Sequence, residues 1–212
     1  MKQKGLTLIE LLVVMAVLAI AGTFIFNIFT STLRGSNKTQ ILGVIKQNGQ
    51  AVLETMDKTI RNSDNVVCPF FLSPTDITSS SNTLVTVKNG IYTRYRFFPP
   101  EQEANGLIKQ DNPVKQNVGE TTIEETDPQF VDRICNVSSL LSNAVFLTDT
   151  NPQTGVSISI QSGQSGIFTR NRSSGFKDKV TIKFTVKPGV GVSISVSGQI
   201  DPVLFQTTIN LR

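Results

Sequence analysis

The chain has 212 residues, a length that suits one ordinary domain plus an accessory segment. Of these residues 39% are hydrophobic, and the formal net charge is +4. It contains no histidine, and this excludes Ser-His-Asp and Cys-His nucleophiles as well as histidine-bearing metal sites. No stretch matches the phosphate-binding pattern G-x-x-x-x-G-K-[ST] either. We therefore predict no enzyme activity, no cofactor and no metal site.

The N-terminal region predicts a helix that spans a membrane. No residue from Leu11 to Leu33 is charged, and these 23 positions exceed the ~20 that a helix needs to cross a bilayer. Lys2 and Lys4 precede the run, and positively charged flanks stay on the cytoplasmic side. We therefore expect a single pass with a cytoplasmic N-terminus, and an extracytoplasmic location for the chain from about residue 35 onward.

Glu10 distinguishes three interpretations of this run. In a plain membrane anchor, its carboxylate would only reach back to the interface. A secretory signal could be cleaved after Ala21, because Ala19-Ile20-Ala21 has the small-x-small pattern. However, Glu10 would then lie inside the apolar core of the signal, and apolar residues continue past Ala21 to Phe29.

The third interpretation comes from "KG" followed by "LTLIE" and a long apolar run, which resembles the prepilin signature of type IV pilins and pseudopilins. The resemblance implies that prepilin peptidase cleaves after Gly5, so that residues 1–5 are a leader peptide. Leu6 would become the N-methylated N-terminus, and Glu10 would be the fifth residue of the mature chain. It also implies a bacterial inner-membrane protein that later enters a pilus or pseudopilus.

This interpretation gives Glu10 a physical role. Cleavage before Leu6 creates an ammonium group about one helical turn from the Glu10 carboxylate. An unpaired ion in an apolar medium costs several kcal/mol, and pairing recovers much of that cost. We therefore assign Glu10 to a salt bridge with its own amine or with that of a neighbouring subunit, which would set the register of assembly.

Beyond Leu33 the apolar residues follow the period of one helical face. They are Ile41, Ile45, Gly49, Val52, Met56 and Ile60. We predict one helix over residues 6–61, about 84 Å long, with 6–33 as the transmembrane or filament-core part and 34–62 as the amphipathic part. The alternative is two helices that break near "RGSN" at residues 34–37.

We predict an α+β fold, in which the long helix is followed by a β-rich globular head at residues 63–212. Asn89-Gly90 is a type I′ turn dipeptide between two alternating runs at 84–97. Further β-branched, alternating runs lie at 144–149, 155–162, 179–187, 191–198 and 204–211. We expect a mainly antiparallel sheet packed on the helix, with residues 99–129 as an irregular excursion and 163–176 as a second loop.

Three further segments, "AVLETMDKTIRNSDNV", "YTRYRF" and "LFQTTINLR", look like those of W-type minor pilins and of J-type minor pseudopilins of type II secretion. This resemblance implies a minor subunit of a pilus or secretion pseudopilus. Its partners would be other subunits in a helix bundle, prepilin peptidase, the inner-membrane assembly platform and the lipid bilayer. The alternative is a membrane-anchored or secreted β-domain that binds a ligand, including a pilus-tip adhesin or a DNA-uptake pilin.

The two cysteines, Cys68 and Cys135, predict a disulfide, because the head would lie in an oxidising compartment. The alternative is a pair of buried thiols. The sequence "DTNPQTG", with Asp149 and Asn151, favours a common turn over a calcium site.

Basic residues near Phe168 and Phe176 raise the question of DNA binding. They are Arg170, Arg172, Lys177 and Lys179. Lys183 and Lys187, however, alternate with apolar residues, as on the solvated face of a strand. We favour an ordinary solvated face over contacts with other subunits, and both of these over DNA.

Overall fold

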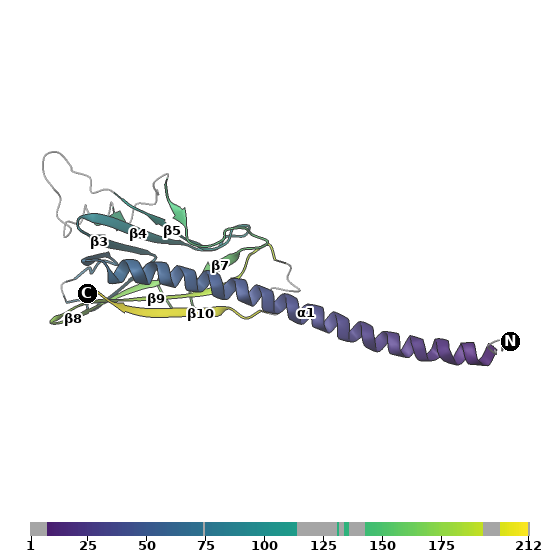
Figure 1. Cartoon of the computed structure of the whole chain (residues 1–212). Helices are drawn as coiled ribbons and strands as arrows, with labels where there is room; N and C mark the ends of the chain where they lie inside the picture. The colour runs from purple at the N-terminus through teal and green to yellow at the C-terminus, as the bar shows by residue number, and fades with distance from the viewer. Residues whose placement is uncertain are drawn as a thin grey trace. The chain divides into compact units, whose positions relative to one another are not determined.

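The computed structural model describes residues 8–73, 75–113, 131, 134–135, 143–192 and 200–211. Within these residues, one long helix is followed by ten strands, and Figure 1 shows their arrangement. The elements are α1 (Leu8–Arg61), β1 (Asn65–Cys68), β2 (Thr78–Ser81), β3 (Thr83–Lys88), β4 (Ile91–Phe98), β5 (Leu107–Asp111), β6 (Val145–Phe146), β7 (Val156–Ser159), β8 (Phe168–Ser173), β9 (Phe176–Pro188) and β10 (Val203–Asn210).

Helix α1 is continuous over its 54 residues, including the "RGSN" segment where a break was the alternative. The prediction of one long helix is therefore confirmed. The chain forms two compact units, Met1–Ile41 and Leu42–Arg212. The described part of the first unit consists only of α1, and the second unit combines the end of α1 with all the strands.

In the second unit, α1 buries the face that the sequence pattern predicts. Its buried residues are Ile45, Gly49, Val52, Met56 and Ile60, five of the six in the predicted stripe. The four larger side chains are completely buried. Burial of each contributes about 1.5–3 kcal/mol to the stability of the head, and this hydrophobic contact fixes the end of the helix to the strands.

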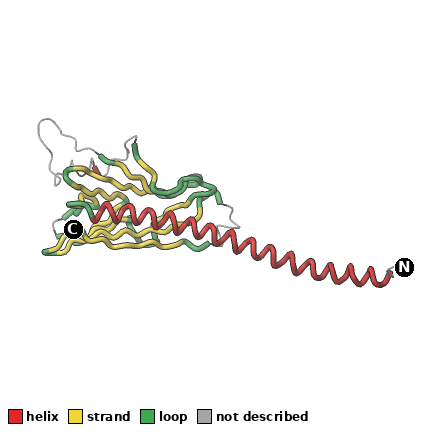
Figure 2. The backbone as a smooth tube through the Cα atoms, in the orientation of Figure 1, coloured by secondary structure: helices red, strands yellow, loops and turns green. Residues whose placement is uncertain are grey.

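The strands form two antiparallel sheets, where the sequence predicted one. The first sheet has the order β1-β3-β4-β5-β6, and the second has β10-β9-β8-β2, with β7 also paired to β9. The part of α1 that belongs to the head lies between the two sheets (Figure 2). Thr59 of α1 accepts a hydrogen bond from Tyr95 of the first sheet, and Gly49 contacts Phe205 of the second. A helix with two covered sides can bury apolar residues of both sheets.

The predicted hairpin at 84–97 is confirmed. Strands β3 and β4 pair in register from Thr83↔Arg96 to Lys88↔Ile91. Asn89 and Gly90 have φ values of 49° and 77°, the left-handed conformation that a type I′ turn requires. The runs at 144–149, 155–162, 179–187 and 204–211 also contain strands, while most of the run at 191–198 lies outside the described residues.

Two expected loops contain strands instead. The polar excursion at 99–129 includes β5, which pairs with β4, while residues 114–129 of it lie outside the described part of the chain. The loop expected at 163–176 contains β8, which pairs with both β9 and β2. Each strand carries one buried charged residue that would be costly to bury alone, and each has a charged partner on a neighbouring strand: Asp111 pairs with Arg94, and Arg170 pairs with Asp178.

Gly49 gives a first testable prediction. A Cβ atom at this position would overlap the ring of Phe205, which stacks on Phe184 with centroids 5.7 Å apart and cannot easily move. We expect Gly49→Ala to destabilise the protein by about 1–3 kcal/mol in urea unfolding, because overpacking outweighs the gain of about 1 kcal/mol in helix propensity. The matched control is Gly43→Ala, since nothing lies within 4 Å of a Cβ at Gly43. This control should leave stability unchanged or raise it, and equal effects of the two variants would contradict the packing argument.

Candidate assembly site

The first compact unit exposes a long apolar helix surface. From Leu8 to Leu33, every large hydrophobic side chain of α1 is between 47% and 83% exposed. The helix is long and apolar enough to cross a membrane. A soluble monomer rarely exposes a contiguous apolar surface of this size. This surface therefore needs a cover, and lipid or other apolar helices have the matching chemistry.

The threonine hydroxyl groups in this segment are already satisfied by the helix. Thr23 donates to the carbonyl of Ile20 at 2.7 Å, and Thr32 donates to that of Ile28 at 2.9 Å. Thr30 likewise donates to the Asn27 carbonyl at 3.0 Å. Because a hydroxyl bonded to its own helix needs no water, these threonines are compatible with an apolar environment.

Glu10 lies in the first turn of α1 and is the one charged residue between Leu8 and Leu33. A carboxylate at this end of a helix interacts favourably with the helix dipole, by about 0.3–1 kcal/mol. That is too little to offset burial of the charge in lipid or in a helix bundle. Gly5 and Leu6, the predicted cleavage and methylation residues, lie outside the described residues.

The head contains a disulfide between Cys68 and Cys135, at the end of β1 and 67 residues further along the chain. Both cysteines are buried in an apolar cluster that includes Val85 and Tyr92. A cross-link that closes a loop of this length stabilises a protein by about 4 kcal/mol in the chain-entropy model. It ties residues 134–135 to the first sheet.

Arginines bind the backbone on both sides of this disulfide. Arg96 of β4 donates to the carbonyl of Cys135 at 3.2 Å, and Arg94 donates to that of Ile134 at 3.1 Å. On the other side, Arg170 of β8 donates to the Pro69 carbonyl at 3.3 Å. Since Arg170 belongs to the second sheet, its bond to the segment after β1 also connects the two sheets.

Arg94 forms a buried ion pair with Asp111, its direct partner on β5. The two side chains are 3% and 0% exposed, and Arg94 Nε donates to Asp111 Oδ1 at 2.8 Å. Burial lowers the pKa of the neighbouring Arg96, the charge of Arg94 lowers it further, and Asp111 opposes both. The Asp111 carboxylate therefore offsets the charge of both buried guanidinium groups.

The four basic residues considered for DNA binding have different environments. Arg170 is only 8% exposed and pairs with Asp178 of β9. Burial lowers its pKa, and Asp178 opposes the shift. Arg172 lies over the ring of Phe71, 4.2 Å from the centroid. Lys177 and Lys179 are exposed on β9. Arg170 is therefore engaged in holding the fold, which leaves no continuous basic stripe along these four positions.

The turn after β6 contains Asp149 and Asn151, the residues considered for calcium. Asp149 accepts a hydrogen bond from the backbone N–H of Asn151 at 2.9 Å, and Asn151 accepts one from that of Gln153 at 2.9 Å. These bonds to the nearby backbone are typical of turns with Asx side chains.

Tyr95 gives a prediction about pH. Its hydroxyl donates to Thr59 of α1 at 2.8 Å, and burial raises the pKa of the phenol above its ordinary value of 10.0. Because the folded state holds this proton more tightly, its contribution to stability is full below about pH 10 and is lost as pH rises through the folded-state pKa. We expect Tyr95→Phe to cost about 1 kcal/mol at pH 8 and to cost less, or nothing, above about pH 10. Urea unfolding across this range measures both, and parallel curves for the two proteins would contradict the assignment.

Comparison with known proteins identifies the N-terminal segment. Residues 1–26 match the family model for the prokaryotic N-terminal methylation motif. No curated protein and no solved structure matches the chain. This motif, together with one long N-terminal helix packed against antiparallel sheets, is a pilin-like arrangement. The motif implies processing by prepilin peptidase, suggests a membrane-anchored or extracellular location, and belongs to proteins that are usually not enzymes.

Proposed function

We propose that this protein is a minor subunit of a type IV pilus or of a type II secretion pseudopilus. The observation that carries the proposal is the methylation motif at residues 1–26, which includes the start of a helix whose apolar surface is uncovered from Leu8 to Leu33. A subunit of this kind needs the apolar helix twice. It is covered by lipid before assembly and by the helices of sister subunits afterwards.

In this proposal the chain has four functional parts. Residues 1–5 are the leader, residues 6–33 the transmembrane and filament-core segment, residues 34–62 the amphipathic continuation of the helix, and residues 63–212 the extracytoplasmic head. Cleavage after Gly5 exposes the amine of Leu6, which is then methylated. The Cys68–Cys135 disulfide agrees with an oxidising location of the head.

The proposed mechanism of assembly is an exchange of one apolar environment for another. Burial of each large apolar side chain stabilises either state by about 1.5–3 kcal/mol. The apolar surface alone therefore favours neither lipid nor filament strongly and does not specify an axial position. The Glu10 carboxylate and the new amine supply that specificity, because an ion pair in an apolar medium forms only in a narrow range of geometries.

The test is recovery of the protein from filaments. Cells that express the full chain with its own assembly machinery are sheared, and the filament fraction is probed for this protein and for cross-links between helices of different subunits. We expect the protein in this fraction in a small amount relative to the main subunit, with cross-links between cysteines introduced in the Leu8–Leu33 segment. A protein confined to the membrane fraction, without such cross-links, would contradict the assignment to a filament.

A further inference from the structure

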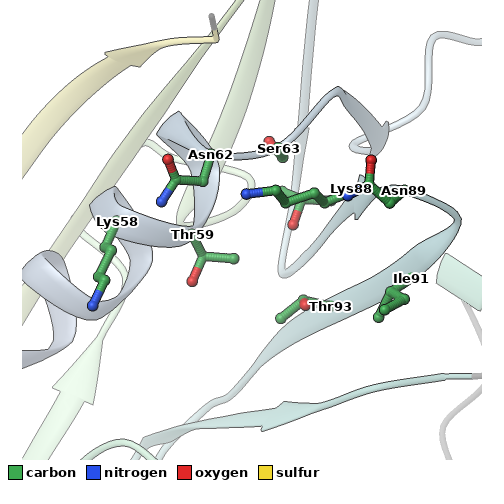
Figure 3. Close-up of a pocket in the computed structure, with 9 residues that line it drawn as sticks. Lys58, Thr59, Asn62, Ser63, Lys88, Asn89, Ile91 and Thr93 are labelled. Atoms are coloured by element: carbon green, nitrogen blue, oxygen red, sulfur yellow. The ribbon is translucent and has the colours of Figure 1, made fainter.

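The head has a pocket of about 330 Å³ between the last turn of α1 and the β3–β4 hairpin. All but one of the residues that line it are of polar or charged types: Lys58, Thr59, Asn62 and Ser63 come from the end of the helix, and Thr86, Lys88, Asn89, Ile91 and Thr93 from the hairpin. Figure 3 shows Lys88 extending from the hairpin toward Asn62. All of these residues lie in the second compact unit.

The walls of the pocket are fixed by hydrogen bonds. Asp64, three residues after the helix ends, accepts a bond from the N–H of Asn89 at 2.7 Å, and its own N–H donates to the Val87 carbonyl at 2.8 Å. The Tyr95–Thr59 bond joins the helix to β4 beside the pocket. The helix end and the hairpin are therefore held together without a ligand, and a ligand that enters does not have to order them.

Two lysines and no acidic residue line the pocket. Among the described residues, neither Lys58 nor Lys88 forms an ion pair or a side-chain hydrogen bond. Asp57 pairs with Arg61, whereas Asp64 accepts a bond from the Asn89 amide and places one negative charge beside the pocket. The helix C-terminus contributes a further negative partial charge of about half an elementary charge, and the sum is still less than the two ammonium groups supply.

We propose that this pocket receives an acidic side chain from a neighbouring protein subunit. The inference rests on the proposed function, which supplies such a neighbour. A carboxylate complements the two lysines, and the hydroxyl and amide groups of Thr93 and Asn62 can complete its hydrogen bonds. Ile91 is 66% exposed at the pocket and offers apolar contact to the methylene groups of a glutamate.

The test uses the full-length protein in detergent micelles at low ionic strength. The probes are a short acetylated peptide with two adjacent glutamates, the same peptide with glutamines, and free glutarate, each titrated calorimetrically. We expect the glutamate peptide to bind about tenfold more tightly than the glutamine peptide, and this preference to disappear in the double variant Lys58→Gln, Lys88→Gln. It should also weaken at high salt, because exposed charges are screened. The control is Lys179→Gln, Lys187→Gln, which removes the same charge from exposed positions on β9 and should leave binding unchanged.

The proposal would be overturned if the protein showed no preference for the glutamate peptide, or if the two double variants lost this preference equally. It would also be overturned if glutarate bound as tightly as the glutamate peptide, because that result would indicate a site for a free anion. Failure of the inference is distinguishable from failure of the proposed function. Filament incorporation without peptide binding removes only the pocket proposal, and lysine-dependent peptide binding by a protein that never enters filaments removes the subunit proposal.

Discussion

Replacement of Glu10 by alanine is expected to leave cleavage intact and to reduce incorporation into filaments by about a hundredfold. The variant leaves the N-terminal amine without its partner. An unpaired ammonium in an apolar helix bundle costs several kcal/mol, and each 1.4 kcal/mol changes an equilibrium by a factor of ten. The ratio of protein in the sheared filament fraction to protein in the membrane measures this effect.

The matched control for this prediction is Glu54→Ala. Glu54 is an exposed acidic residue on the same helix but within the head, and the variant should incorporate normally. Glu10→Gln keeps the shape and polarity of the side chain while removing its charge, so it should fail nearly as badly as alanine. Normal incorporation of both Glu10 variants would show that the pairing is not what positions the subunit.

The second large effect is expected from Asp111→Ala, which should destabilise the head by about 3–5 kcal/mol. Arg94 is 3% exposed and would remain buried without its carboxylate, and removal of one partner of a buried pair has a cost of this size. The loss should be at the upper end of the range, because Asp111 also offsets the charge of Arg96. Urea or thermal unfolding of the oxidised protein measures the change.

The control for Asp111→Ala is Asp57→Ala, which breaks the Arg61–Asp57 pair on the helix surface. Its side chains are 47% and 32% exposed, and exposed pairs of this kind contribute about 0.3–0.5 kcal/mol. A loss at Asp111 no larger than the loss at Asp57 would mean that water or another group compensates Arg94. In that case the buried pair is not what holds β4 and β5 together.

The elements that the sequence predicts well have a local cause. The helix face that includes Ile45, Val52 and Met56 follows from the spacing of apolar residues. The turn at Asn89-Gly90 follows from the left-handed backbone that these two residues tolerate. The N-terminal motif and its long apolar run are equally local. In each case, the residues that determine the structure lie within a few positions of one another.

The elements that the sequence did not predict depend on distant partners. Strand β8 has the sequence "FTRNRS", and Arg170 near its centre is buried beside Asp178 on β9, which offsets its charge. Strand β5 ends in Asp111, whose partner Arg94 lies on another strand. Strand β2 is "TSSS", an edge strand without apolar alternation. A pattern search treats such polar segments as loops, and the division into two sheets follows from pairings that no single segment encodes.

We propose that proteolysis creates the positive charge that makes Glu10 tolerable in an apolar environment. N-terminal sequencing and intact mass measurement of the protein purified from cells that contain prepilin peptidase test this proposal. We expect a chain that begins at an N-methylated Leu6. A mature chain that begins at Gly22 would indicate an ordinary secretory signal, one that begins at Met1 would indicate a simple anchor, and either result would rule out the pairing of Glu10 with the amine of Leu6.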